Sequence, residues 1–556
     1  MPRFLKATSF ILLCASCFLL GTIFPSDDAQ SPITREVVES AEKLIGLSFS
    51  DAKRDSMLEG LRENLDSYEA IRRMNVANSV PPAILFNPIP QGMKFETGKK
   101  PVRTSSPGNV IVPANLDDLA FYSVGQLGEL IRTKRVTSEQ LTRMYLDRLK
   151  KYGPKLECVI TLTEDLAIRQ ARHADEEIAA GKYRGPLHGI PYGVKDLLAT
   201  KGIRTTWGSV PYKDQMIDED ATVIQRLEAA GAVLVAKLTM GALAWGDVWY
   251  GGKTRNPWDY DQGSSGSSAG SASATAAGLV GFSIGTETWG SIVSPSTRCG
   301  TTGLRPTYGR VSRSGAMALS WSMDKIGPIC RTVEDCALVF AAIYGPDGKD
   351  QTLYDVPFNY NPNIKLSDLR IGFLKSDFDS VKEGREFNDQ AFSVLRRLGA
   401  NLIPIKLPQY PVNDLSIILT AEAGAAFDEL TRSGKDDLLV RQIKNAWPNV
   451  FRLSRFIPAV EYINANRIRS LLIQDMAALM NDVDLYIAPS LQGDNLLLTN
   501  LTGHPCVVLP NGFTEKGTPT SITFMGRLFG EAQLLAVAKQ YQDATDFHLK
   551  HPILKD

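Results

Sequence analysis

Apolar residues in the first part of the chain recur at the three- and four-residue spacing of amphipathic helices. One set is Val37, Val38, Ala41, Leu44 and Ile45, and a second is Met57, Leu61, Leu65, Tyr68 and Ile71. Ser50 stands where it can cap the second helix. Pro81-Pro82 ends the helical pattern, and further prolines up to Pro113 indicate irregular structure. We therefore expect residues 31–115 to form a helical and irregular extension.

From Ser123 onward, apolar strands alternate with amphipathic helices. Thr137 to Gln140 reads as a capping box that opens a helix. Two later segments repeat a unit in which glycine ends a helix and a strand follows, which predicts neighbouring parallel strands. The first comprises 222–230, Gly231 and 233–235, and the second 371–374, 391–398, Gly399 and 402–405. Two more strands are expected at 485–489 and 507–510. We expect one α/β domain over residues 116–550.

The N-terminus has the layout of a secretory signal. Arg3 and Lys6 precede an apolar run from Phe10 to Phe24, and Pro25-Ser26-Asp27-Asp28 follows. The run is short for a membrane span. No clear small-x-small cleavage site is present, so a cleaved signal peptide and an uncleaved anchor within residues 1–30 both fit. The sequence predicts export to the periplasm, cell envelope or medium, with membrane anchoring as one form of it.

Composition narrows the classes of partner. Lysine plus arginine equals aspartate plus glutamate at 61 each, so no net positive field indicates a nucleic-acid partner. The mature region shows no spacing of cysteine and histidine typical of a metal site, and we expect no metal or cofactor. A disulfide among Cys299, Cys330 and Cys336 stays open, as does a homodimer.

Three segments carry candidate chemistry. Gly189 to Asp196 places Lys195 among apolar and glycine residues, a Ser/Gly run from Gly263 to Gly278 contains Ser267 and Ser268, and Gly285 to Ser291 ends in a serine behind a glycine-containing turn. A lysine and two serines can form a nucleophilic hydrolase without histidine.

These segments resemble the amidase signature family of serine hydrolases over about 124–542. The family pattern is roughly GGSSGG(S/E), then G(S/T)(D/E)xGGS, then CGxxGxKP. The corresponding residues are Gly266 to Ser271, Gly285 to Ser291 and Cys299 to Thr307, and 24 positions separate Ser267 from Ser291. The resemblance implies a large mixed twisted β-sheet covered by helices on both faces.

The resemblance also assigns roles. Lys195 would act as base, Ser267, held by a cis peptide bond, would relay the proton, and Ser291 would attack the carbonyl carbon of a small-molecule or peptide amide. The backbone N–H groups of Thr288, Trp289, Gly290 and Ser291 would bind the oxyanion, and Ser268, Thr286 and Glu287 would support the unit. A lysine serves as base only when neutral, so its pKa must fall well below about 10.4 through burial without a paired carboxylate. An ion pair of Lys195 with adjacent Asp196 is the structural alternative.

Departures from the family pattern affect specificity. Trp289 stands where glycine is usual, and Val293 stands where many relatives, amidotransferase subunits included, carry arginine. With Glu287 in place of aspartate, these residues resemble the peptide-amidase-like branch. We expect the Trp289 ring to narrow the acyl side of the pocket, whereas packing as a plug in the core is the alternative. Asn500 to Pro505 matches a late family element that shapes the pocket, and His504 is interpreted there as structural.

Other functions remain open at this stage. One is the glutaminase (A) subunit of a tRNA-dependent amidotransferase, which needs cytosolic partners, and another is a non-enzymatic binding protein on an amidase scaffold. The Ser/Gly run could also be a flexible linker. Gly266-Ser267-Ser268-Ala269-Gly270 also satisfies GxSxG, but that nucleophile elbow must follow a buried strand, and the preceding residues 253–262 are polar.

Overall fold

The computed structural model describes residues 33–74 and 76–555, in two compact units that divide after Val76. The predicted signal or anchor at 1–30 lies outside the described residues, as do Cys14 and Cys17. The boundary between the two units falls within the expected extension, since residues 77–115 belong to the second unit. Among the helices described, none combines the length and apolarity needed to span a membrane.

The first unit contains the two predicted helices, α2 (Arg35–Ile45) and α3 (Asp51–Arg73). Ser50 takes the N-cap position of α3, although its side chain makes no capping hydrogen bond. Arg54 Nη2 lies 2.9 Å from Glu42 Oε2, and this ion pair links the two helices.

A mixed sheet of eleven strands forms the centre of the second unit. Its order is β1 (Val159–Leu162), β3 (Val233–Leu238), β2 (Pro191–Lys195), β8 (Phe282–Glu287), β10 (Lys325–Cys330), β9 (Thr302–Arg305), β14 (Cys506–Phe513), β15 (Pro519–Gly526), β13 (Leu485–Pro489), β11 (Arg370–Leu374) and β12 (Asn401–Ile405). β2 runs parallel to β3 and β8, and β11 runs parallel to β12 and β13. The predicted parallel neighbours β11 and β12 are thus confirmed.

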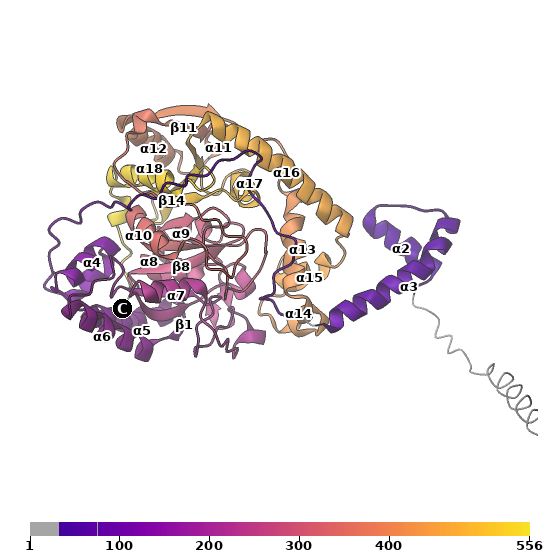
Figure 1. Ribbon diagram of the computed structural model, residues 1–556, viewed down its shortest axis with the longest axis horizontal. Helices are drawn as coiled ribbons and strands as arrows, with labels where there is room; N and C mark the ends of the chain where they lie inside the picture. The colour runs from indigo at the N-terminus through magenta and orange to yellow at the C-terminus, as the bar shows by residue number, and fades with distance from the viewer. Residues whose placement is uncertain (1–32, 75, 556) are drawn as a thin grey trace, which may run out of the picture. The chain divides into compact units, whose positions relative to one another are not determined.

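Helices surround this sheet, as the α/β prediction requires. They are α4 (Val124–Arg132), α5 (Ser138–Leu156), α6 (Glu164–Ala179), α7 (Thr222–Ala229), α8 (Ala269–Ala276), α9 (Val293–Cys299), α10 (Val333–Ile343), α11 (Lys375–Ser380), α12 (Arg385–Arg397), α13 (Ile417–Ala426), α14 (Asp428–Arg432), α15 (Trp447–Ser454), α16 (Ala459–Asp482), α17 (Asn495–Thr502) and α18 (Glu531–Asp543). α5 and α6 lie near β1, whereas α11 and α12 lie near β11 (Figure 1). The capping box of Thr137 and Gln140 at α5 is confirmed.

The Ser/Gly run folds as a close-packed helix, so the linker interpretation is wrong. Every residue of α8 is buried. A Cβ on Gly270 would lie 2.5 Å from the backbone of Cys158 and Thr239, and a Cβ on Gly285 would lie 2.8 Å from Ser268 Oγ. Small residues let α8 approach β8 closely enough for serine hydroxyls to reach the sheet.

Candidate active site

Lys195 ends strand β2 in a fully buried position. Its Nζ donates to Ser267 Oγ at 2.7 Å and to Thr286 Oγ1 at 2.8 Å, and Ser268 Oγ lies 3.3 Å away. The parallel strands β2 and β8 end at the same edge of the sheet, which brings Lys195 beside Thr286. The strand pairing thus unites two segments that are 91 residues apart.

Burial makes this lysine a usable base, because it disfavours the charged form. Desolvation lowers the pKa of Lys195 to about 7. The carboxylates of Asp324 and Glu287 raise this pKa, but their effect is smaller than that of burial. The neighbouring carboxylate, Asp196, pairs instead with the buried Lys237, whose Nζ lies 3.2 Å from Asp196 Oδ1. The alternative of a Lys195–Asp196 ion pair is therefore wrong. Lys237, a charged residue inside an apolar strand, is a signal that the motif analysis did not use.

The serine pair presents two hydroxyls in different situations. The Gly266–Ser267 peptide bond is cis, as the family resemblance implies. Ser268 Oγ donates to Thr286 O at 3.0 Å and accepts from Thr286 N at 3.1 Å. Ser267 Oγ is the closer of the two hydroxyls to Lys195 Nζ, at 2.7 Å against 3.3 Å for Ser268 Oγ, which is also engaged with the Thr286 backbone.

Ser291 lies directly against this pair. Ser268 N donates to Ser291 O at 3.2 Å, which joins the loop after β8 to the start of α8. Within the described part of the chain, no hydrogen-bond partner is present for Ser291 Oγ, nor does any group accept from the backbone N–H groups of residues 288–291. Gly290 adopts a φ of 86°, and a Cβ there would lie 3.0 Å from Leu496. The loop therefore offers a free hydroxyl beside free backbone donors.

The carboxylate of Glu287 holds the end of this loop through hydrogen bonds. Its Oε2 accepts from Ile292 N at 2.8 Å and Val293 N at 2.9 Å. Its Oε1 accepts from Arg305 Nη1 at 2.8 Å and Asn500 Nδ2 at 2.9 Å. Burial alone raises the pKa of Glu287, but attraction to Arg305 and these hydrogen bonds outweigh it and lower that pKa. Arg305 and Asn500 lie in the sequence motifs, but no local pattern indicates their pairing with Glu287.

The remaining candidates are structural or lie at the surface. Trp289 is 43% exposed, so the interpretation of its ring as a core plug is wrong. Burial lowers the pKa of His504 to about 3, and its Nδ1 lies 2.8 Å from Thr502 Oγ1.

The five cysteines of the described residues are free, Cys299, Cys330 and Cys336 among them. The same residues contain no cluster of histidine, cysteine or carboxylate groups arranged to hold a metal.

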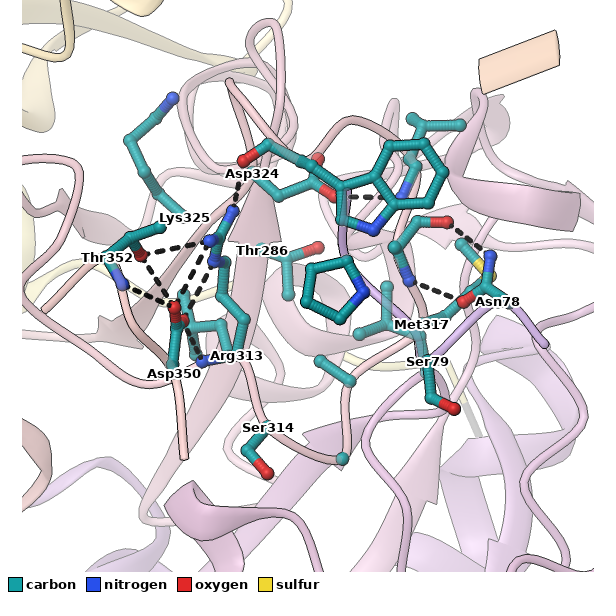
Figure 2. A pocket seen from close by; sticks show the side chains of 18 of the residues that line it. Asn78, Ser79, Thr286, Arg313, Ser314, Met317, Asp324, Lys325, Asp350 and Thr352 are labelled. Carbon is teal, nitrogen blue, oxygen red and sulfur yellow. Dashed lines mark hydrogen bonds and ion pairs between the residues drawn. The ribbon is translucent and has the colours of Figure 1, made fainter. Parts of the chain in front are cut away.

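A cavity of about 330 Å³ lies beside the candidate active site. Thr286 and Thr288 line it, and Figure 2 shows Thr286 and Asp324 at its wall. Asp324 Oδ1 accepts from Thr288 Oγ1. The Lys195 partner Thr286 thus connects the buried base to a space that a ligand can enter.

Comparison with known proteins agrees with this geometry. Residues 140–535 match the family model described as Amidase. The A subunit of glutamyl-tRNA(Gln) amidotransferase from Marinomonas sp. (strain MWYL1) is 34% identical over 480 residues, which cover 78% of this chain and 98% of that protein.

Solved structures of both kinds of relative share the fold. Native peptide amidase from Stenotrophomonas maltophilia is 30% identical with a TM-score of 0.68, and the match covers 77% of this chain and 97% of that one. The A subunit of glutamyl-tRNA(Gln) amidotransferase from Thermotoga maritima is 26% identical with a TM-score of 0.68, covering 79% of this chain and 99% of that one. The chain belongs to the amidase signature family and is a hydrolase that acts on the carbon–nitrogen bonds of linear amides.

Proposed function

We propose that the protein is a free-standing amidase that hydrolyses carboxylic amides through an acyl-enzyme at Ser291. The observation that carries the proposal is Lys195 Nζ, fully buried, without a paired carboxylate, and 2.7 Å from Ser267 Oγ. A neutral amine in this position can accept a proton from a hydroxyl at physiological pH.

We infer the proton path from the Lys195–Ser267 contact and from the roles that the family resemblance implies. Lys195 takes the proton of Ser267 as Ser267 takes that of Ser291, whose Oγ attacks the amide carbon. Backbone N–H groups of residues 288–291 stabilise the oxyanion, each contributing about 3 kcal/mol to the transition state. The proton then returns through Ser267 to the leaving nitrogen, and the C–N bond breaks. Water then passes a proton through Ser267 to Lys195 as its oxygen adds to the acyl carbon. The bond from that carbon to Ser291 Oγ breaks, Ser291 regains the proton through Ser267, and the carboxylic acid leaves.

A second candidate is the glutaminase component of a tRNA-dependent amidotransferase. Its support is the 34% identity to the A subunit of such an enzyme over nearly the full length of that protein. In that case the chain would need partner subunits and would use glutamine as its amide. We place it second because Val293 stands where many such subunits carry arginine and because the N-terminal sequence predicts export.

Covalent labelling tests the main proposal. A fluorophosphonate should label the purified protein, and peptide mapping should place the label on Ser291. Ser291→Ala should abolish labelling and hydrolysis. Ser271→Ala is the matched control, because this buried serine donates to Ile284 O rather than toward Lys195. A label on Ser268 would overturn the assignment.

Assembly decides between the two candidates. The purified chain should hydrolyse amides alone, and adding the other amidotransferase components from the same host should leave its rate on glutamine unchanged. Stable complex formation with a large rise in glutaminase rate would instead establish the second candidate.

A further inference from the structure

A strap formed by residues 78–86 runs over the cavity beside the candidate active site. It belongs to the second unit but precedes the part of the chain that matches the family model. Asn78 anchors one end, since its Nδ2 donates to Ala318 O at 2.9 Å and its Oδ1 accepts from Ala318 N at 2.8 Å. Figure 2 shows Asn78 and Ser79 close to Met317 at the edge of the cavity.

Phe86 anchors the other end of the strap. Its ring meets Tyr308 edge-on with a centroid distance of 5.0 Å, and the Arg469 guanidinium lies 3.5 Å from the ring centroid. Arg469 is itself fixed by hydrogen bonds to Ser322 and to Leu501 O. The strap is thus held at two points, and exposed residues lie between them.

The residues between the anchors supply apolar surface to the cavity. Pro81, Ile84 and Leu85 line it from the strap. Apolar side chains of the sheet and loops line it as well, namely Leu197, Ala244, Met317, Leu319 and Ile326. Ile84 and Leu85 also line a second, apolar cavity of about 670 Å³ that reaches α13 and α16. Space for a ligand therefore lies on both sides of these residues.

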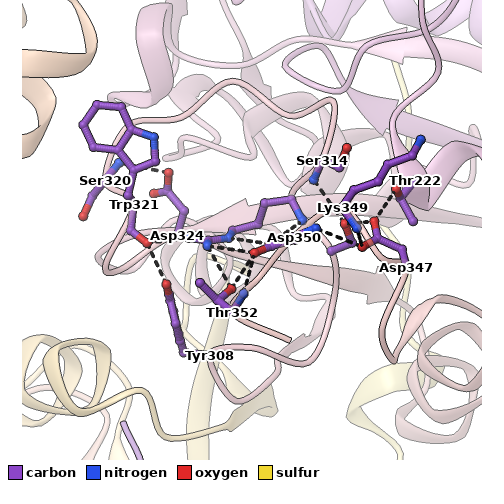
Figure 3. A network of polar contacts seen from close by, with 12 residues as sticks. Thr222, Tyr308, Ser314, Ser320, Trp321, Asp324, Asp347, Lys349, Asp350 and Thr352 are labelled. Atoms are coloured by element: carbon purple, nitrogen blue, oxygen red, sulfur yellow. Dashed lines mark hydrogen bonds and ion pairs between the residues drawn. The ribbon is translucent and has the colours of Figure 1, made fainter. Parts of the chain in front are cut away.

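The charged groups of the cavity leave little to bind a carboxylate. Arg313 uses Nε and Nη2 on Asp350, Nη2 also on Thr352 Oγ1, and Nη1 on Trp321 O. Figure 3 shows Asp350 and Thr352 within this closed network. Asp324, beside Thr288, would repel the α-carboxylate of glutamine, and the apolar part of the lining would desolvate both charges of its zwitterionic head group.

Besides Arg313, the basic residues that line the cavity are Lys325 and Lys349. Lys325 is buried and donates to Met323 O, while Lys349 is exposed at the mouth, where water screens its charge. Among the described lining residues, Arg313 keeps one unused N–H, and Lys325 keeps the donors that Met323 O does not take, while burial holds the pKa of Lys325 well below its ordinary value and so disfavours its charged form.

We propose that the strap selects primary amides with an uncharged, apolar acyl group, which packs against Ile84 and Leu85, and that it disfavours glutamine. The proposal rests on the proposed amidase function and names its substrate class. A hexanoyl group has four more carbons than an acetyl group with which to contact Ile84 and Leu85.

Kinetics on a pair of primary amides give the first test. The wild-type enzyme should show a kcat/KM for hexanamide at least tenfold above that for acetamide, with glutamine lowest. Ile84→Ser combined with Leu85→Ser should reduce the hexanamide-to-acetamide ratio about tenfold without changing the melting temperature. Ile111→Ser removes an isoleucine outside the cavity that is 71% exposed, against 82% for Ile84, and should leave the ratio as it is. An unchanged ratio in the strap variant would overturn the proposal.

Binding to the inactive Ser291→Ala protein separates the two hypotheses. Calorimetry should detect hexanamide but no glutamine, and the strap substitutions in this background should weaken hexanamide binding about tenfold. Glutamine binding more tightly than hexanamide refutes the substrate class whether or not the wild type turns over. If hexanamide binds as described but no amide is hydrolysed, the amidase function fails and the strap's selectivity stands.

Discussion

Replacing Lys195 by methionine should make the protein more stable at neutral pH while it removes activity. The side chain is fully buried, and lowering its pKa from 10.5 to about 7 corresponds to about 5 kcal/mol of unfavourable protonation free energy. At pH 7 part of the folded protein already holds Lys195 in its neutral form, so the free-energy cost of burying this side chain is about 4 kcal/mol. Methionine keeps the length of the side chain without the charge.

The loss of hydrogen bonds reduces this gain. Ser267 Oγ and Thr286 Oγ1 each lose the Lys195 donor, at about 1 kcal/mol per bond. Lys195→Met should therefore raise the free energy of unfolding by about 2 kcal/mol at pH 7. The functional cost is the loss of the proton acceptor, so turnover should fall by several orders of magnitude.

The pH dependence isolates the ionisation of this one group. The folded protein holds fewer protons on Lys195 than the unfolded chain does, so wild-type stability rises with pH between about 7 and 10.5. Relative to Lys195→Met, the wild type should gain about 2 kcal/mol between pH 7 and pH 9 and change little between pH 7 and pH 6. Urea unfolding of both proteins at these three pH values measures the difference.

Lys237 provides the opposing control. It is equally buried but lies 3.2 Å from Asp196, so Lys237→Met strands a buried carboxylate and should destabilise the fold by about 3–5 kcal/mol. A stability difference between wild type and Lys195→Met that stays constant from pH 7 to pH 9 would refute the lowered pKa and, with it, the role of Lys195 as base.

Other properties can be measured on the same preparations. The rate of amide hydrolysis should rise with pH through one ionisation near pH 7 as Lys195 becomes neutral; a rate that is flat from pH 6 to pH 8 would contradict the assignment. Glu287→Gln should lower stability by about 3–5 kcal/mol in urea unfolding, because Arg305 stays buried without its counter-charge, and unaltered stability would show that the pair is not needed. Trp289→Gly should cost about 1 kcal/mol or less, since the ring is 43% exposed, and should shift kcat/KM toward bulkier acyl amides; an unchanged ratio for a short and a long amide would deny Trp289 a place in the pocket. Fractionation of the host should find the activity outside the cytosol, as residues 1–30 predict, and soluble cytosolic enzyme with an intact N-terminus would rule that out.

The parts of the fold visible in the sequence are those fixed by local spacing. The capping box at Thr137 depends on residues a few positions apart, so the start of its helix could be predicted. The glycine that ends the helix before β12 is a local signal as well, and with it the parallel pairing of β11 and β12 could be predicted. The motif order likewise indicated the residues of the candidate site. Contacts such as Glu287 with Asn500 span 213 residues and depend on strand order, which no local pattern encodes. The sequence predicts irregular structure after Pro81-Pro82, and the strap is irregular, but its hydrogen bonds to Ala318, 240 residues away, have no local signal.

The carboxylate of Glu287 makes the catalytic loop dependent on the last part of the chain. The loop's N–H groups and Asn500 bind the same carboxylate, and Arg305, its counter-charge, also donates to Thr499 and to His504 O. During synthesis, Lys195, Ser267 and Ser291 therefore all emerge well before the residues that hold the loop in shape. A partly made or C-terminally clipped chain carries the three proposed catalytic residues without the contacts that hold the loop. We therefore expect the hydrolase to become active only after this last part of the chain has folded.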